Sequence, residues 1–236
     1  MTFKKKAIMA FPEVQASKIR TLSLDAFKEM DYYAVNNYHL PVELMMESAG
    51  LQLARLTASV AEPGSLVLVA VGPGNNGGGG LVAARRLEAW GYKVHMQLPL
   101  KPTHDIVNDQ LSRTISYGVE RAMEEDYDVI LDCLFGFSQR LPLPEEVSEL
   151  IETMNAIEAK KISLDIPTGI CEGGECFRFK ADKVLTVAAP KTILLNHIDE
   201  YDLYIADVGI PIEVYLRNKI SYATLGFYQD QIIKLV

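Results

Sequence analysis

A chain of 236 residues, 49% hydrophobic and 23% charged, has the length and composition of one globular domain. Its net charge of −8 argues against nucleic acid or an anionic membrane as its main partner, because an acidic surface attracts neither. The chain has no apolar run of the roughly 18 residues that cross a bilayer, and residues 1–10 lack the features of a signal peptide. Three cysteines without a C-x-x-C spacing fit a reducing, cytoplasmic compartment.

Two helical patterns open the chain, at residues 23–36 and 41–60, and Ser23 is the predicted N-cap of the first. Strand and helix patterns then alternate. We expect strands at 65–71, 92–98, 128–131, 161–164, 183–188 and 203–206, and helices at 81–90, within 105–117 and at 145–158. Gly91 is placed to end the helix before it.

This alternation predicts an α/β fold: a three-layer α/β/α sandwich around a mostly parallel, Rossmann-like sheet. No repeat and no linker divides the sequence. We therefore expect a single domain over residues 1–236, with a helical N-terminal segment at about 20–60.

Polar residues follow three of the predicted strands. Asn75 and Asn76 follow the first, Asp132 the third and Asp165 the fourth. Ligands of such sheets bind beyond the carboxyl ends of the strands. A single Asp at a strand end often only caps the next turn, but two beside a glycine-rich loop favour a site.

The glycine-rich loop, V-G-P-G-N-N-G-G-G-G at residues 71–80, is the most distinctive stretch of the chain. Glycines at the start of a helix expose N–H groups and the positive end of the helix dipole to an anion such as phosphate. The loop satisfies G-x-G-x-x-G, yet residues 97–101 lack the acid that a dinucleotide-binding fold places about 20 residues on. No G-K-[ST] follows either, so the loop fits neither an ordinary NAD-dependent dehydrogenase nor a P-loop.

The fuller string at residues 72–87, G-P-G-N-N-G-G-x-G-L-V-A-A-R-x-L, closely resembles the hallmark of the YjeF N-terminal domain family, the NAD(P)H-hydrate epimerases. Further family-like motifs follow the same order, at residues 43–50, 132–138, 164–169, 188–191 and 207–211. The resemblance implies that the substrates are NADHX and NADPHX, in which water has added to the nicotinamide ring. Family members interconvert their S and R epimers, so that a separate dehydratase can restore all of the material.

The resemblance also implies the substrate-binding residues, in two loops and at one strand end: Asn75, Asn76, Gly77, Gly78, Gly79, Gly136, Phe137, Ser138, Gln139, Arg140, Leu141, Pro142 and Asp165. Residues 139–142 depart from the usual family ending of the second loop. Asp165 is the candidate catalytic acid–base residue. Loss of the hydroxyl from the hydrated carbon leaves a cation stabilised by the ring nitrogen, and a carboxylate could protonate that hydroxyl and deprotonate the incoming water.

Asn76, Asp132 and Thr168 match the family's potassium ligands, and their oxygen atoms suit a hard cation. Without that match, Asn76 would be taken as a turn residue and Thr168 as a helix cap. The resemblance further implies a homodimer. Lys191 is either part of a functional loop or an exposed lysine beside Pro190, and Cys133 fits a small buried filler.

Gly79 stands where the family normally has Asp, in N-N-G-G-D-G. The alternative to an enzyme is therefore a non-catalytic binding or dimerisation module of the same fold. The four residues Asn76, Asp132, Asp165 and Thr168 favour the enzyme, because a scaffold has no need of a complete cation site.

Overall fold

The computed structural model describes residues 10–173 and 176–236. The segment judged unlike a signal peptide lies outside these residues, except for Ala10. The elements in chain order are β1 (Glu13–Val14), η1 (Ala16–Lys18), α1 (Leu24–Tyr38), α2 (Val42–Val60), β2 (Leu66–Val71), α3 (Asn75–Ala89), β3 (Lys93–Gln97), α4 (Asp105–Ser116), β4 (Val129–Cys133), α5 (Glu145–Ala156), β5 (Lys160–Leu164), β6 (Lys183–Val187), α6 (Thr192–Leu195), η2 (Ile198–Glu200), β7 (Asp202–Ala206), α7 (Ile212–Arg217), α8 (Tyr222–Leu225) and β8 (Ile232–Leu235).

The strands form one eight-stranded sheet in the order β1-β8-β7-β6-β5-β4-β2-β3. Every neighbouring pair is parallel except β7 and β8, which are antiparallel. The predicted α/β fold with a mostly parallel sheet is confirmed. The sequence patterns did not predict β1 and β8, which are short and lie together at one edge.

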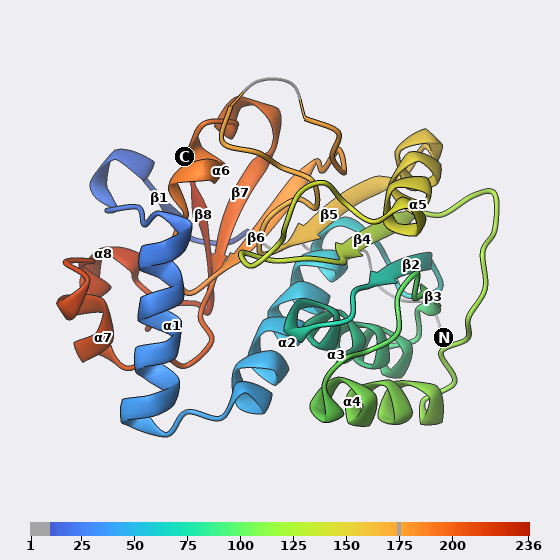
Figure 1. The fold of residues 1–236 in the computed structure, drawn as a ribbon, viewed down its shortest axis with the longest axis horizontal. Helices are drawn as coiled ribbons and strands as arrows, with labels where there is room; N and C mark the ends of the chain where they lie inside the picture. The colour runs from blue at the N-terminus through green and yellow to red at the C-terminus, as the bar shows by residue number, and fades with distance from the viewer. Residues whose placement is uncertain (1–9, 174–175) are drawn as a thin grey trace.

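Helices cover both faces of the sheet (Figure 1). Strand β2 shows the division, since its side chains alternate between two cores. Val67, Val69 and Val71 pack in the core that includes α2 and α3, whereas Leu68 and Ala70 pack with Val147 and Ile151 of α5. A strand that is buried on both faces explains why this segment reads as an unbroken apolar run.

The predicted start of the third helix was wrong. α3 begins at Asn75, so Gly77 to Gly80 lie within its first two turns instead of forming a loop. None of these glycines has a positive φ. Their use is close packing: a Cβ at Gly78 would lie 2.4 Å from Met46 Sδ, and one at Gly80 would lie 2.5 Å from Cys133 Cβ. Glycine here lets α3 approach α2 and the sheet, although it lowers helix propensity.

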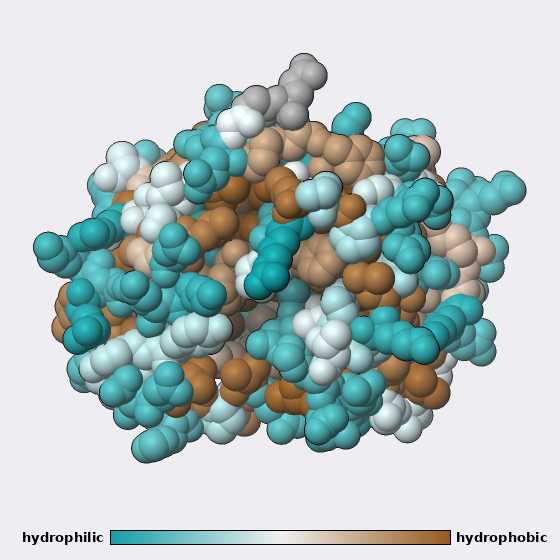
Figure 2. Space-filling model, viewed as in Figure 1, coloured by the Kyte–Doolittle hydropathy of each residue, from teal (hydrophilic) through white to brown (hydrophobic). Residues whose placement is uncertain are grey.

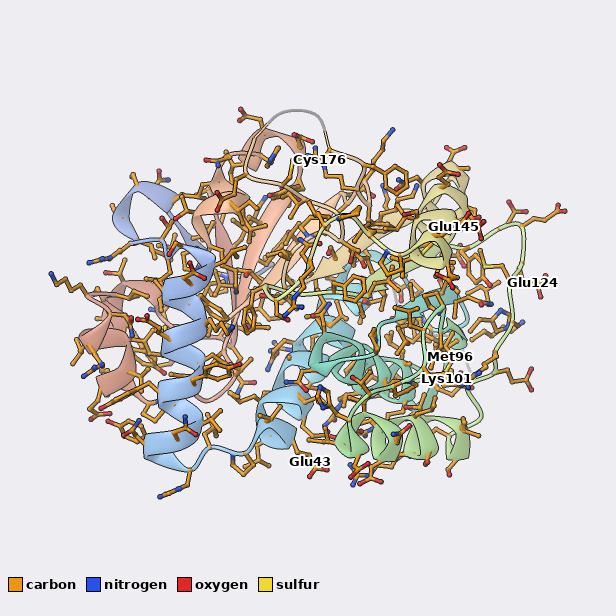
Figure 3. All side chains as sticks on the ribbon, viewed as in Figure 1. Glu43, Met96, Lys101, Glu124, Glu145 and Cys176 are labelled. Atoms are coloured by element: carbon orange, nitrogen blue, oxygen red, sulfur yellow. A yellow bond between two sulfur atoms is a disulfide. The ribbon has the colours of Figure 1, made fainter. Side chains whose placement is uncertain are left out.

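Contacts between α2, α3 and α4 fix this face of the molecule. Glu47 of α2 forms ion pairs with Arg85 and Arg86 of α3 and accepts a hydrogen bond from Gln110 of α4. Glu43, labelled in Figure 3 at the start of α2, pairs with Arg113 of α4 at 2.6 Å. The family-like motif at residues 43–50 therefore holds α3 and α4 in place beside α2.

Other local predictions are confirmed. Ser23 Oγ accepts the N–H of Ala26 at the start of α1, and Gly91 has a φ of +89° just after α3. Cys133 is a buried free thiol, as predicted. Cys171 and Cys176 are joined by a disulfide in the connection between β5 and β6, where Figure 3 labels Cys176, so the cysteines do not support the predicted reducing compartment. In the described parts of the chain, no helix has both the length and the apolar character needed to cross a membrane.

Candidate functional site

The predicted site residues gather at the carboxyl ends of neighbouring strands. β2 pairs with β3 on one side and with β4 on the other, so the chain changes direction across the sheet at β2. Such a reversal opens a crevice for ligands in parallel α/β sheets. Gly72, directly after β2, donates its N–H to Cys133 O of β4 at 3.0 Å. A Cβ at Gly72 would lie 1.6 Å from Leu134 O, so only glycine allows this approach.

A cavity of about 540 Å³ lies at these strand ends. In Figure 2 the surface is hollowed near the middle of the face shown, and hydrophobic residues border the hollow. Many of the predicted substrate-binding residues line the cavity: Asn75, Asn76, Gly79, Gly136, Phe137, Ser138, Arg140 and Asp165. A second hollow, of about 790 Å³ beside Arg178 and Tyr201, contains none of them.

Five predicted substrate-binding residues do not line the cavity: Gly77, Gly78, Gln139, Leu141 and Pro142. Gly77 and Gly78 are used in packing. Gln139 joins two loops instead, because its Oε1 accepts the N–H of Gly169 at 2.8 Å and its Nε2 donates to Ile170 O. Leu141 is 49% exposed. These residues lie in or beside the two predicted loops, but the structure gives them no direct place in the cavity wall.

Asp165 forms a buried ion pair with Lys191. Its Oδ1 lies 2.7 Å from Lys191 Nζ, and its Oδ2 accepts the N–H of Phe137 at 2.7 Å. Lys191 is 0% exposed and Asp165 is 3% exposed. Lys191 therefore belongs to the site, and the alternative of an exposed lysine is excluded. Burial lowers the pKa of the Lys191 ammonium, and the charge of Asp165 opposes that effect.

The backbone at this pair adopts an uncommon conformation. Asp165 has a φ of +70° and Ala188, at the end of the adjacent strand β6, has a φ of +61°. Both line the cavity. Non-glycine residues in the left-handed region cost about 1–3 kcal/mol each and cluster at functional sites. The conformation at Asp165 supports the view that this rim is built for a ligand.

Helix α1 closes the cavity from the side opposite the glycine-rich start of α3. Phe27 stacks edge-on against Phe137 at 5.0 Å, and its ring lies 3.6 Å from Lys191 Nζ. Just before α1, Leu22 accepts the N–H of Thr192 and donates its own N–H to Pro190 O. The N-terminal segment is thus fixed directly to the residues on either side of Lys191.

One turn after Phe27, Asp31 also lines the cavity. Residues i and i+4 share a face of a helix, so burying Phe27 directs Asp31 towards the same space. The pKa of Asp31 is raised to about 6, first by burial and then by the charge of Asp165, while Lys191 opposes the rise. The described residues provide no hydrogen-bond donor to the Asp31 side chain.

Asp132 lies beneath the cavity, fully buried in a network of uncharged donors. Its Oδ1 accepts from Thr168 Oγ1 at 2.7 Å and from the N–H of Leu134, and its Oδ2 accepts from Ser163 Oγ and the N–H of Thr168. Burial raises its pKa, and these hydrogen bonds oppose that rise. No basic side chain forms an ion pair with Asp132 in the part of the chain that the structure describes.

Two of the three predicted potassium ligands, Asp132 and Thr168, are in direct contact. Asn76 is tied instead to the end of β5, because its Nδ2 donates to Leu164 O at 3.3 Å. The Asn76 Oδ1 atom faces Gly136, where a Cβ would lie 3.4 Å from it and 2.7 Å from Asp165 Oδ2. Thr168 Oγ1 also accepts the N–H of Phe135, which leaves one lone pair.

The donor set fits a monovalent hard cation on chemical grounds. The charge of Asp132 is buried without a cationic partner among the described residues, and Asn76 Oδ1 and Thr168 Oγ1 have oxygen lone pairs to spare. Across the same residues, no group of three or more His, Cys, Asp or Glu is placed to hold a metal ion. Ligation by Asn and Thr together with one Asp is consistent with that result.

Sequence reasoning left the role of Lys191 open and did not single out Asp31. The family-like motif at residues 188–191 contains Lys191 but gives no sign that its ammonium is buried. For Asp31 a signal existed: it is an acid at the edge of the helical face formed by Ala26, Phe27 and Met30. An acid beside a buried helical stripe is a reason to look for a cavity.

Residues 42–193, more than half of the chain, match the family model described as the YjeF-related protein N-terminus. The chain belongs to the YjeF N-terminal family. The match contains the glycine-rich start of α3, Asp132, Asp165 and Lys191. It leaves α1 and Asp31 outside.

Comparison with known proteins supports membership of the YjeF N-terminal family. The chain is 32% identical to an NAD(P)H-hydrate epimerase of Dehalogenimonas lykanthroporepellens, covering 96% of this chain and 97% of that one. It is 30% identical to an NAD(P)H-hydrate epimerase of Rhodopirellula baltica, over 91% of both chains. A bifunctional NAD(P)H-hydrate repair enzyme of Thermofilum pendens is 33% identical over 73% of this chain and 36% of its own length.

The fold is also found in a crystal structure of the yeast protein ynu0. The two structures superpose with a TM-score of 0.80 at 24% sequence identity, over 92% of this chain and 100% of the yeast chain. The likeness shows that this chain has a known fold.

Proposed function

We propose that this protein is an NAD(P)H-hydrate epimerase, an isomerase that interconverts the S and R epimers of NADHX and NADPHX. The observation that carries the proposal is the Asp165–Lys191 pair, buried at the wall of a cavity that the start of α3 and the loop after β4 also line. Two relatives similar over more than nine tenths of the chain bear this name.

The cavity offers suitable groups for both ends of such a substrate. Asn75 and Asn76 form the first turn of α3, where N–H groups and the helix dipole favour a phosphate. Arg140 adds a positive charge on the same wall. Asp165 would bind the hydrated ring as a carboxylate oriented by Lys191 and by the N–H of Phe137. The hydrated carbon can lose its hydroxyl because the ring nitrogen stabilises the resulting cation.

The absence of Asp at position 79 does not remove the charged groups of the cavity. Gly79 lines it, and Asp31, Asp165 and Lys191 remain around the same space. Nothing in the described part of the chain favours the alternative of a non-catalytic module.

The test follows one purified epimer of NADHX by chromatography with and without the protein. We expect the wild-type protein to bring the two epimers to equilibrium faster than the spontaneous reaction. Replacing Asp165→Asn should slow the catalysed reaction by about 100-fold or more, as for other groups that contact the reacting centre. A wild-type protein that adds nothing to the spontaneous rate would overturn the proposal.

We propose potassium as the cation that Asp132, Thr168 and Asn76 would hold. Its contribution would be a fixed positive charge beneath the cavity that offsets the buried carboxylate of Asp132. KCl should raise the melting temperature above that in NaCl or choline chloride at the same ionic strength. Equal melting temperatures in the three salts would contradict this proposal while leaving the epimerase proposal standing.

We also propose a homodimer in the cytoplasm, working with a separate dehydratase that consumes one epimer. The bifunctional repair enzyme of Thermofilum pendens gives partial support, since its name places repair of NAD(P)H hydrate and a second activity in one chain. Sedimentation of the purified protein would test the dimer directly.

A further inference from the structure

The cavity contains two carboxylates whose surroundings differ. Asp165 accepts the N–H of Phe137 with one oxygen and is paired with Lys191 through the other. An oxygen of Asp165 that took a proton would weaken these contacts. Asp31, on α1, has neither a hydrogen bond nor an ion pair with the residues that the structure describes, and its side chain is only half-buried. One carboxylate is fixed in place, whereas the other is open to the cavity.

The position of Asp31 is determined by packing. Phe27 is 1% exposed between Phe137 and Lys191, so α1 cannot turn about its axis without losing these contacts. That arrangement fixes the next turn, and Asp31 lies on the cavity wall close enough to Asp165 and Lys191 for their charges to act on it.

We propose that Asp31 is the catalytic residue that transfers the proton in the epimerisation, while Asp165 binds and orients the ring. This proposal rests on the proposed function. Protonated Asp31 gives its proton to the hydroxyl oxygen on the hydrated carbon. The carbon–oxygen bond breaks and water leaves with the bonding pair, while the ring nitrogen lone pair forms a double bond to that carbon. Water then attacks the other face and returns one proton to the Asp31 carboxylate. No electron is gained or lost overall.

The charges of Asp31, Asp165 and Lys191 favour this proton transfer. With Asp31 protonated, the Asp165 carboxylate and the Lys191 ammonium cancel. Once Asp31 has given up its proton, the three groups together carry one negative charge, just when the ring carries one positive charge. The opposite charges appear in the same step, within a partly desolvated cavity where their attraction is strong.

The pH dependence follows from the same groups. The pKa of Asp31 is about 6, so both protonation states are accessible near neutral pH, as acid–base catalysis requires. Besides Asp165, which is paired with Lys191, the charged or titratable groups that line the cavity are Lys28 and Tyr32 of α1, Arg140 of the loop after β4, and His104 before α4. Since the reaction begins from protonated Asp31, kcat/KM should fall as pH rises through the pKa of Asp31.

The decisive variant is Asp31→Asn, assayed on one NADHX epimer from about pH 5 to pH 8. We expect kcat to fall by about 100-fold or more, KM to change much less, and the pH dependence of kcat/KM to disappear. Glu29→Gln is the matched control, because it removes an exposed carboxylate from the same helix without touching the cavity. This control should keep the wild-type rate and pH profile.

The outcomes separate this inference from the proposed function. If the wild-type protein has no epimerase activity, both the proposed function and the role of Asp31 are contradicted. An active wild-type enzyme whose Asp31→Asn variant keeps its rate and pH profile overturns the role of Asp31 alone. If the Asp31→Asn variant does not fold, the pH profile of the wild-type enzyme is the test. A wild-type kcat/KM that is constant from about pH 5 to pH 8 overturns the role of Asp31.

Discussion

Two clusters at the same rim of the sheet each contain a buried carboxylate. One carboxylate is held by neutral hydrogen bonds and the other by an ion pair. Asp132 in β4, with Ser163 and Thr168, forms a lower cluster in which four uncharged donors satisfy one carboxylate. Asp165, directly after β5, joins Lys191 and Asp31 in a cavity cluster that depends on charge and faces the open space.

The difference teaches that position at a strand end does not determine the role of an acid. Four neutral hydrogen bonds satisfy the Asp132 carboxylate, so the lower cluster holds the loops after β4 and β5 together, and Thr168 Oγ1 keeps one lone pair for the proposed cation. An ion pair with one nearby free carboxylate leaves the cavity cluster able to respond to a charged ligand. The following substitutions test this contrast, from the largest expected effect to the smallest.

Breaking the ion pair should have the largest effect on folding. Lys191→Met leaves Asp165 buried and unpaired, which should lower the free energy of unfolding by about 3–5 kcal/mol. Adding Asp165→Asn should recover part of that loss, since the uncompensated charge is then gone. Urea denaturation measures both, and Lys160→Met, at an exposed lysine, should change stability by less than about 0.5 kcal/mol. A loss below about 1 kcal/mol for Lys191→Met would mean that the pair contributes little.

Removing one neutral donor should have a smaller effect. Thr168→Val deletes the hydroxyl that donates to Asp132 and accepts from the N–H of Phe135, so we expect a loss of about 1–3 kcal/mol. Thr168→Ser retains the hydroxyl and should cost less than about 1 kcal/mol. Chemical denaturation of the two variants gives the comparison. Equal losses would show that the methyl group, and not the hydrogen bonds, stabilises this cluster.

Adding a methyl group at Gly79, beside Leu164, should lower stability by less than the two substitutions above. A Cβ at Gly79 would lie 2.9 Å from Leu164 Cδ2, the residue just before Asp165, and Leu164 must shift to admit it. Gly79→Ala should therefore lower stability by about 1 kcal/mol, since overpacking outweighs the gain in helix propensity. The control is Gly173→Ala, where a Cβ would have no neighbour within 4 Å. A more stable Gly79→Ala protein would show that Leu164 moves freely.

The smallest effect concerns Asp31 and depends on pH. Its pKa in the folded protein, about 6, lies above its ordinary value of 3.8, so the ionised side chain destabilises the fold. That penalty is absent below the lower value and develops as pH rises through the higher one. Asp31→Asn should therefore melt a few degrees above the wild-type protein at about pH 7.5 and match it near pH 3.5. The opposite sign at high pH would contradict the raised pKa.

Much of the fold could be predicted because its strands are short apolar runs separated by amphipathic helices. The start of α3 could not, since glycine opposes a helix by propensity and only the neighbouring Met46 and Cys133 explain why it is there. The edge strand β1 has only two residues, which are too few to produce a pattern of their own.

Site residues could be predicted where a motif lies directly after a strand, as at Asp165. They were missed where only tertiary packing brings a side chain to the site. A lysine is exposed by default, and nothing in the residues around Lys191 reveals that Phe27, far away in the sequence, covers its ammonium. The acid–base role of Asp165 rested on its match to the family motif, and it stays a prediction. Asp31 was missed because residues 23–36 were interpreted only as a helix with Ser23 at its start.

The two backbone hydrogen bonds between Leu22 and the residues flanking Lys191 bear on how the protein can be shortened. A fragment cut to the family boundaries, residues 42–193, would keep α3, Asp165 and Lys191. It would lose α1 together with Asp31, uncover the Lys191 ammonium to water, and lose the pairing of β6 with β7. For this chain, a helix that lies outside the family match is part of the wall of the cavity.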